Sequence, residues 1–105
     1  MQEPKQKMIK DIKKLIEYPK EGILSKKLAG ENANVALFCM AKGTNISSHT
    51  STKKGFVYVV EGNGVFNLEG KDIKMTQDIF IFMKENAVHS LNAKENTSFI
   101  LCLFN

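Results

Sequence analysis

The sequence contains no arginine: all 15 basic residues are lysines. Arginine makes the bidentate contacts to phosphates and guanine bases on which many nucleic-acid-binding proteins depend. The formal net charge of +4 comes from one short region, since residues 1–30 hold eight lysines and four acidic residues and the remainder is balanced. We interpret this region as a solvated, Lys-rich leader and expect no nucleic-acid partner.

Cysteine is also scarce. Cys39 and Cys102 are the only two in the chain, and each lies inside an apolar run, where a free thiol packs as a small hydrophobe. Two such residues do not make a disulfide framework. No apolar run approaches the roughly 20 residues that a membrane-spanning helix needs, and the first residues lack the apolar segment of a secretory signal. These absences predict a cytoplasmic protein without a membrane partner.

Several catalytic motifs are missing as well. The chain has two histidines and no Gly-x-Ser-x-Gly elbow, which argues against a Ser-His-Asp hydrolase. It has no Walker-type phosphate loop and no Cys-x-x-Cys pair, so neither P-loop nucleotide chemistry nor dithiol redox chemistry is expected. Glu61 and Glu69 flank a predicted hairpin, and we interpret them as solvated turn residues rather than as an acid–base pair.

Residues 1–20 carry a helical pattern of apolar side chains. These side chains have the spacing i, i+1, i+4, i+7 and i+8, which is typical of one helix face. They are Met8, Ile9, Ile12, Leu15 and Ile16. Pro19 predicts that this helix ends at Tyr18. The stripe either packs on the rest of the chain or meets a partner chain, and we expect the first. The predicted organisation is a leader over residues 1–20 and one domain over residues 21–105.

The domain has the pattern of an all-β protein. Short β-branched and aromatic segments alternate with turn residues. The predicted strands cover residues 23–28, 35–40, 56–60, 65–68, 73–75, 79–83, 88–91 and 98–104. The sequence at 61–64, Glu-Gly-Asn-Gly, predicts a tight hairpin, because glycine and asparagine accept positive φ angles. About eight short strands with regular turns predict a small antiparallel β-barrel or jelly roll.

His49 and His89 are the residues most suited to chemistry, because imidazole is the commonest metal ligand and titrates near neutral pH. We expect each to open a strand. Alternation along the first of these strands would place His49 and Ser51 on the same face. The surrounding spacings are Gly43-x5-His49-x-Ser51-x3-Gly55-x6-Gly62 and Asp78-x5-Lys84-x-Asn86-x2-His89.

These spacings resemble the two signature motifs of the cupin superfamily, and the resemblance covers roughly residues 34–105. It implies a barrel in which two His and one Glu from the first motif and one His from the second surround a metal ion. At those positions this sequence has His49, Ser51, Gly55 and His89. The resemblance therefore implies an incomplete metal shell of His49 and His89, whose other positions are left to water, substrate or another residue such as Cys39 or Tyr58.

Three functions follow from this pattern. The first is a small cupin-like protein that binds a small molecule in the barrel with little or no catalysis, through His49, Ser51, Val57 and His89. The second is a metal-dependent enzyme of dioxygenase or isomerase type, with Fe, Mn, Ni or Zn on His49 and His89. The third is an accessory dimeric protein that acts through its leader or its dimer surface.

The strands predicted at 56–60 and 79–83 are apolar at successive positions, which indicates that both of their faces are covered. We expect a homodimer in which sheet packs on sheet and the segment 23–28 reaches across to the partner. The resemblance implies the same, since small single-domain cupins are often dimers.

Overall fold

The computed structural model describes residues 9–30 and 34–105. Within these residues it contains one helical turn and nine strands. The elements are α2 (Ile12–Leu15), β1 (Ile23–Ala29), β2 (Asn34–Met40), β3 (Asn45–His49), β4 (Lys54–Glu61), β5 (Gly64–Leu68), β6 (Lys71–Met75), β7 (Phe80–Met83), β8 (His89–Ala93) and β9 (Thr97–Phe104). The predicted all-β fold is confirmed.

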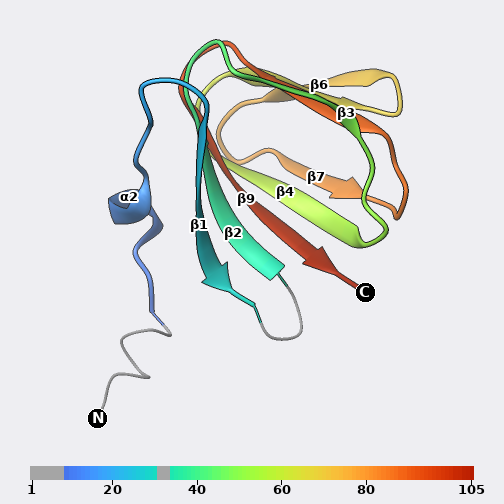
Figure 1. Cartoon of the computed structure of the whole chain (residues 1–105), viewed down its shortest axis with the longest axis horizontal. Coiled ribbons are helices and arrows are strands. Elements are labelled where there is room, and N and C mark those ends of the chain that lie inside the picture. Colours follow the sequence, from blue (N-terminus) through green and yellow to red (C-terminus); the bar gives the residue numbers. More distant parts are fainter. Residues whose placement is uncertain (1–8, 31–33) are drawn as a thin grey trace.

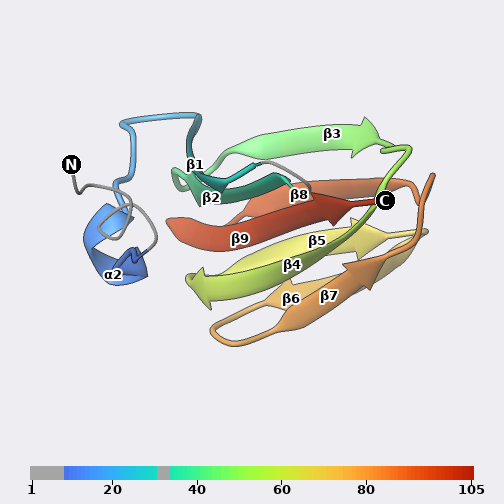
Figure 2. The same cartoon turned by 90° about the horizontal axis from the view of Figure 1, so that it is seen from below.

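The strands form two antiparallel sheets that face each other (Figure 1). One sheet has the order β1-β2-β9-β4-β7 and the other has the order β3-β8-β5-β6. Figure 2 shows β6 and β7 at one side of the two sheets and β1 and β3 at the other. The pairings described within each sheet do not continue into the other sheet, so the architecture is a jelly-roll-like sandwich rather than a closed barrel.

The segment 61–64 differs from the sequence prediction. β4 ends at Glu61 and β5 begins at Gly64, but these two strands belong to different sheets. Gly62 has a φ of +124°, and the Asn63 carbonyl oxygen accepts hydrogen bonds from the two amides that follow β8. The hairpin prediction was therefore wrong. The turn residues are present, but they carry the chain from one sheet to the other.

The interior lies between the two sheets. Strand alternation sends one set of apolar side chains inward from both sheets. Its buried members are Met40, Val57, Val59, Phe66, Met75, Ile81, Met83, Leu91, Ala93 and Phe99. Burial of these side chains is the main force that holds the sheets together. A cavity remains between the sheets, near the end of β3 and the start of β8.

The leader is less helical than its sequence pattern predicts. α2 is a single turn, Asp11 makes no side-chain cap bond at its start, and Ile16 is already extended with φ −65° and ψ 126°. Without a cap, an isolated turn has little intrinsic stability. Met8 lies outside the described residues. The predicted end at Tyr18 is therefore too late, because the extended backbone begins at Ile16.

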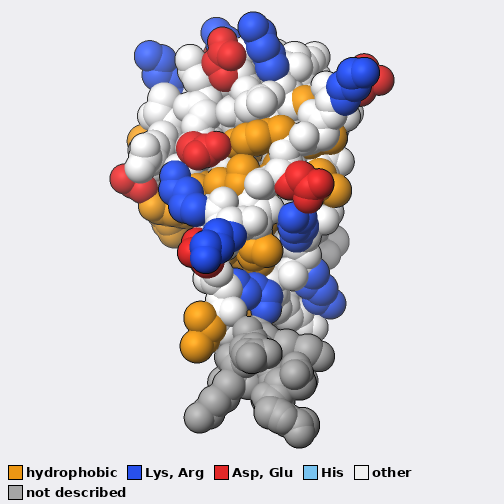
Figure 3. All heavy atoms as spheres, turned by 90° about the vertical axis from the view of Figure 1, so that its left-hand side faces the viewer, with side chains coloured by type: hydrophobic (Ala, Val, Ile, Leu, Met, Phe, Trp, Pro, Cys, Tyr) orange, Lys and Arg blue, Asp and Glu red, His pale blue; other side chains and the backbone are white. Residues whose placement is uncertain are grey.

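The leader nevertheless packs on the chain, as expected. It covers part of the outer face of the five-stranded sheet, where a second apolar cluster is centred on Leu37, Cys39 and Val60. The residues packed against this centre are Ile12, Leu15, Ile16, Tyr18, Leu28, Tyr58 and Ile100. Figure 3 shows the side of the molecule on which α2 and β1 lie, with hydrophobic side chains between lysines and acidic residues.

β1 does not extend away from its own chain. It pairs antiparallel with β2, from Ile23 opposite Met40 to Ala29 opposite Val35. This pairing places the segment 23–28 at an edge of the five-stranded sheet, and its expected contact with a partner chain stays a prediction. Among the described residues, no helix has the length and apolarity needed to cross a bilayer.

Candidate functional site

A cavity of about 220 Å³ lies between the two sheets. Eight of its ten lining side chains are apolar, and they come from both sheets. The lining residues are Phe38, Ile46, His49, Val57, Phe66, Met83, His89, Leu91, Phe99 and Leu101. An apolar wall with a few polar groups is the usual composition of a small-molecule site, and here the two polar side chains are the histidines.

The fold brings His49 and His89 together from adjacent strands. β8 begins at His89, as predicted, whereas His49 ends β3 instead of opening a strand. The two residues are direct partners across the β3–β8 pair, after an irregularity in register that follows Ile46. Their ring centroids are 4.1 Å apart, with an angle of 62° between the rings. The pair that the sequence singled out is therefore a contact in the fold.

The two imidazoles differ in exposure. His89 is only 7% exposed, and its ring stacks on Phe66 with 5.7 Å between centroids and an interplanar angle of 3°. His49 is exposed. His89 thus lies in the interior of the cavity and His49 at its mouth.

Hydrogen bonds fix the tautomer of both rings. The Nδ1 atom of His49 lies 2.8 Å from the Ser47 carbonyl oxygen, and the Nδ1 atom of His89 lies 2.9 Å from the Ala87 carbonyl oxygen. A carbonyl oxygen only accepts, so each Nδ1 must carry the proton and donate. In the neutral rings each Nε2 is then an unprotonated acceptor. Neither Nε2 has a hydrogen-bond partner among the described residues.

The electrostatic environment favours the neutral form of the inner ring. Burial lowers the pKa of His89 below its ordinary value of 6.5, and the neighbouring His49 lowers it further, against the hydrogen bond to Ala87, which raises it. Among the residues that the structure describes, no acidic or lysine side chain lines the cavity to compensate a positive charge. At neutral pH the site therefore presents an uncharged imidazole in its interior.

Ser51 does not line the cavity with the histidines. It lies in the connection between β3 and β4, its hydroxyl accepts the Lys53 amide at 3.1 Å, and its carbonyl oxygen accepts the Asn86 amide at 2.7 Å. The expected shared face with His49 was wrong because strand alternation stops where β3 ends. Ser51 instead ties the β3–β4 connection to the turn before His89, in which Asn86 has a φ of 65°.

Gly55 is buried at a position that admits no side chain. A Cβ atom there would lie 2.6 Å from Cδ2 of Leu103 and 2.7 Å from the carbonyl oxygen of Cys102. Cys39 and Tyr58, the other residues considered as metal ligands, lie on the outer face of the five-stranded sheet, in the second apolar cluster. Among the described residues, no group of three or more His, Cys, Asp or Glu side chains is placed to hold a metal ion.

The aromatic part of the cavity wall was not singled out from the sequence as a site. Phe38, Phe66 and Phe99 line it together with Val57, which was predicted. Phe38 and Phe99 are stacked partners on β2 and β9, with 5.3 Å between centroids. Alternation within the predicted strands was the available signal. It identifies inward residues but not the few that border a cavity.

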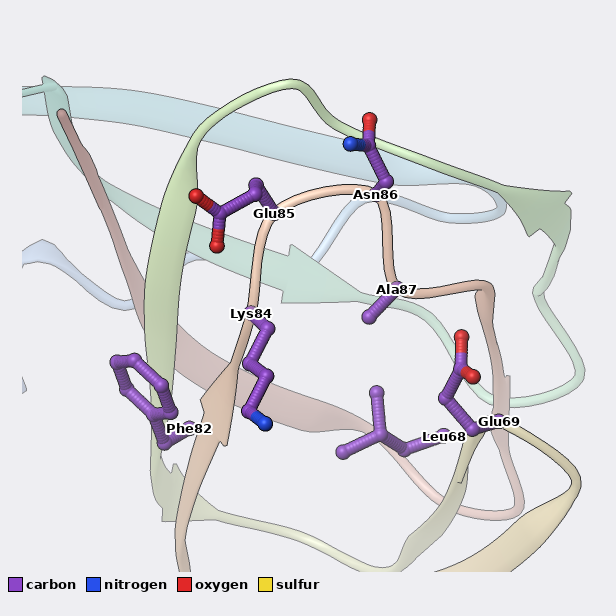
Figure 4. A pocket seen from close by; sticks show the side chains of 7 residues that line it. All are labelled: Leu68, Glu69, Phe82, Lys84, Glu85, Asn86 and Ala87. Atoms are coloured by element: carbon purple, nitrogen blue, oxygen red, sulfur yellow. The ribbon is translucent and has the colours of Figure 1, made fainter.

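A second, more open hollow of about 430 Å³ lies beside the turn that precedes His89. Figure 4 shows Leu68, Lys84 and Ala87 pointing toward its middle, whereas Asn86 points away. Most of its lining residues are exposed. Its main relation to the site is through Glu69, whose carboxylate accepts the Val88 amide at 2.6 Å and thereby anchors the start of β8.

The family follows from a direct match to the sequence. A family model described as the cupin domain matches residues 36–104. The chain belongs to the cupin family. The match spans the two sheets except β1, and it includes both histidines, which the cupin resemblance had placed at metal-ligand positions.

Solved structures of other proteins share the fold. A conserved protein of unknown function from Streptococcus pyogenes is 18% identical, with a TM-score of 0.83 over 92% of this cupin and 86% of that chain. A cupin superfamily protein from Desulfitobacterium hafniense is 19% identical, with a TM-score of 0.81 over 88% of this chain and 86% of that one. At these identities the likeness establishes the fold alone.

One enzyme is also similar in fold. A mutant of salicylate 1,2-dioxygenase from Pseudoaminobacter salicylatoxidans is 14% identical, with a TM-score of 0.72 over 78% of this cupin and 26% of the dioxygenase chain. No curated protein was matched by the sequence.

Proposed function

We propose that this cupin binds a small molecule in the cavity between its sheets, with His49 and His89 orienting the ligand and little or no catalysis. The observation that carries this proposal is the position of the pair. Both rings border a cavity of about 220 Å³ whose other walls are apolar. Burial of a ligand's apolar surface would supply affinity, and the imidazoles would select its orientation.

The donor set does not fit the metal centre that the family implies. Structural and catalytic transition-metal sites use three or four protein ligands, and here two imidazoles border the cavity. The Ser51 hydroxyl is engaged by the Lys53 amide, and no side chain fits at Gly55 without a backbone shift. Ligand binding without a metal-dependent reaction therefore agrees better with the side chains at this site than a metal-dependent reaction does.

A cavity-filling variant tests the proposal. We expect toluene, phenol or another monocyclic probe to bind wild-type protein saturably in NMR titrations. Leu91→Phe places a larger side chain in the cavity wall and should weaken binding by roughly tenfold or more, because the space for the probe is lost. Val65→Phe is the matched control, since Val65 lies on the opposite, outer face of the same sheet.

The result is interpretable only if both variants keep the fold, which circular dichroism and thermal unfolding would establish. Absence of saturable binding for every monocyclic probe would contradict the proposal. Equal binding to wild type and to Leu91→Phe would also contradict it, because the probes would then bind elsewhere.

One observation favours a metal-dependent enzyme as the second candidate. Metal-ligating histidines usually donate one ring N–H to a carbonyl or carboxylate and leave the other nitrogen bare, which is the arrangement of His49 and His89. Elemental analysis of protein purified without a His tag decides between the candidates. Stoichiometric metal that is lost in a His49→Ala/His89→Ala variant would favour the enzyme, and traces unchanged in the variant would reject it.

A further inference from the structure

We propose that the ligand of this cavity is a small monocyclic or similarly compact apolar molecule that carries a hydrogen-bond donor, such as a phenolic or alcoholic hydroxyl. This inference rests on the proposed binding function and specifies the chemistry of the ligand. Its basis is the hydrogen-bonding capacity that the two fixed imidazoles leave in the cavity.

The two histidines at the cavity supply hydrogen-bond acceptors. Each Nδ1 donates to a backbone carbonyl oxygen, so the Nε2 of each neutral ring is unprotonated and can accept a hydrogen bond from a ligand. The His89 ring is additionally held by its stack on Phe66. The orientation of this acceptor is therefore set before a ligand enters, so that little ordering is required on binding.

The rest of the cavity wall, among the described residues, supplies no side-chain hydrogen-bond donor. The other eight lining residues are Phe, Ile, Val, Met or Leu, none of which has a side chain that donates a conventional hydrogen bond. A hydroxyl or N–H group on the ligand would find an acceptor in the cavity. An ether, ketone or carboxylate would find no donor there, and a buried acceptor without a partner is costly.

The volume of the cavity limits the size of the ligand. An apolar cavity of about 150 Å³ lined by Leu, Ile and Phe is large enough for benzene. The present cavity, at about 220 Å³, therefore has space for one six-membered ring with one or two small substituents. Three phenylalanines in the wall, Phe38, Phe66 and Phe99, provide aromatic surface against which such a ring would pack.

The test compares probes of nearly equal size that differ in donor capacity. Dissociation constants for phenol, toluene, anisole and benzoate would be measured by NMR titration at pH 8, first without EDTA and then with it. We expect phenol to bind roughly tenfold more tightly than toluene or anisole, which corresponds to one well-made hydrogen bond. Benzoate should be the weakest of the four.

Two variants connect this preference to the histidines. His89→Phe keeps an aromatic ring against Phe66 and removes the inner acceptor. The preference for phenol over toluene should then be lost, because an apolar site without an acceptor favours toluene. His49→Phe removes the acceptor at the exposed mouth and provides a second measurement if His89→Phe does not fold. Val65→Phe is the control, because Val65 lies on the outer face of the sheet, away from the cavity, and its replacement should leave the preference unchanged.

The outcomes separate the inference from the function on which it rests. Binding of all four probes without a donor preference overturns the inference and leaves small-molecule binding in place. A phenol preference that disappears when EDTA is added overturns it as well, since a metal ion would then be the group that recognises the hydroxyl. Failure of every probe, toluene included, overturns both.

Discussion

At the scale of single residues, Tyr18 joins the leader to the sheet. Its hydroxyl donates to Glu61 at 2.8 Å, and the ammonium group of Lys13 lies 3.5 Å from the other oxygen of the same carboxylate. Burial of the ring, together with this carboxylate, raises the pKa of Tyr18 to about 12. Glu61 was interpreted from the sequence as a solvated turn residue, but it is a contact between leader and domain.

The raised pKa of Tyr18 predicts a loss of stability in alkali. The unfolded chain releases this phenolic proton near pH 10, whereas the folded chain keeps it until about pH 12. Above pH 10 deprotonation therefore favours the unfolded state, so the contribution is present below pH 10 and is lost between pH 10 and 12. Ultraviolet titration of phenolate should show a late transition that is absent in Tyr18→Phe.

The control for this titration is the second tyrosine of the chain. A hydrogen bond to the Asp78 carboxylate raises the pKa of Tyr58 as well, so Tyr18→Phe should retain one tyrosine transition above the ordinary value. A single transition near pH 10 for both residues in wild-type protein would show that Tyr18 is not held against Glu61.

The candidate site illustrates which residue positions a sequence can specify. His49 and His89 were identified because their spacing matches the cupin motifs, although Ser51 and Gly55 stand at the other two ligand positions. Ser51 was misplaced because counting by two assumes that a strand continues, and β3 ends at His49. The proton positions on the two rings depend on carbonyl groups of Ser47 and Ala87, and backbone contacts of this kind leave no pattern in residue types.

At the scale of elements, the leader is held by side-chain packing rather than by helix formation. α2 has four residues, too few for a stable isolated helix. Ile12, Leu15 and Ile16 are half-buried against the outer face of the five-stranded sheet. The apolar spacing therefore indicated the contact residues Ile12, Leu15 and Ile16 but not Ile9, which is 79% exposed, and the expected helix is a single turn.

Truncating this contact should destabilise the domain. Leu15→Ala/Ile16→Ala removes two half-buried side chains and should lower the free energy of unfolding by about 2–4 kcal/mol. Ile9→Ala is the control, because Ile9 is 79% exposed and its truncation should change the value by less than about 0.5 kcal/mol. Urea denaturation measures both changes. Equal stability of the double variant and wild type would mean that the leader is not docked in solution.

The strands were more predictable than their connections. β-branched and aromatic runs located most strands to within a few residues, because burial on a pleated surface selects those residue types. The turn at 69–70 joins β5 and β6 of one sheet, with Glu69 at φ 52° and Gly70 at φ 87°. The turn at 61–64 has similar residues and crosses between sheets. Local turn chemistry thus specifies a reversal of direction but not the sheet that the next strand joins.

At the scale of the whole molecule, the two outer faces differ in chemistry. The outer face of the four-stranded sheet is polar, with side chains that include Asn45, Ser47, Asn67, Asp72, Ser90 and Asn92. The outer face of the five-stranded sheet is apolar, and the described residues of the leader cover the part around Leu37. On β7, Phe80 and Phe82 remain 59% and 47% exposed, and Phe80 contacts Phe56 with 5.1 Å between ring centroids. Exposed aromatic clusters of this kind mark interaction sites.

The charges around these three phenylalanines suit a second copy of the chain. Gly55 pairs with Met83, which puts Lys54 and Lys84 at the same end of β4 and β7. Asp78 lies at the opposite end, where its carboxylate accepts the Tyr58 hydroxyl. A two-fold axis that lies in the interface, perpendicular to the strands, would bring the lysine end of one copy over the aspartate end of the other. We therefore expect a homodimer through this face.

Analytical ultracentrifugation of matched variants tests this expectation. Phe80→Ser/Phe82→Ser should raise the dimer dissociation constant roughly a hundredfold or more, because aromatic side chains at the centre of an interface dominate its energy. Ile9→Ser, which removes an exposed apolar side chain outside the face, should leave the constant unchanged. Asp78→Lys should weaken the dimer, and Asp78→Lys/Lys84→Asp should recover much of the loss if opposite ends meet. A dimer that persists in Phe80→Ser/Phe82→Ser would have to use another surface, which would contradict the expectation. In that case the Asp78→Lys/Lys84→Asp variant should also show no recovery.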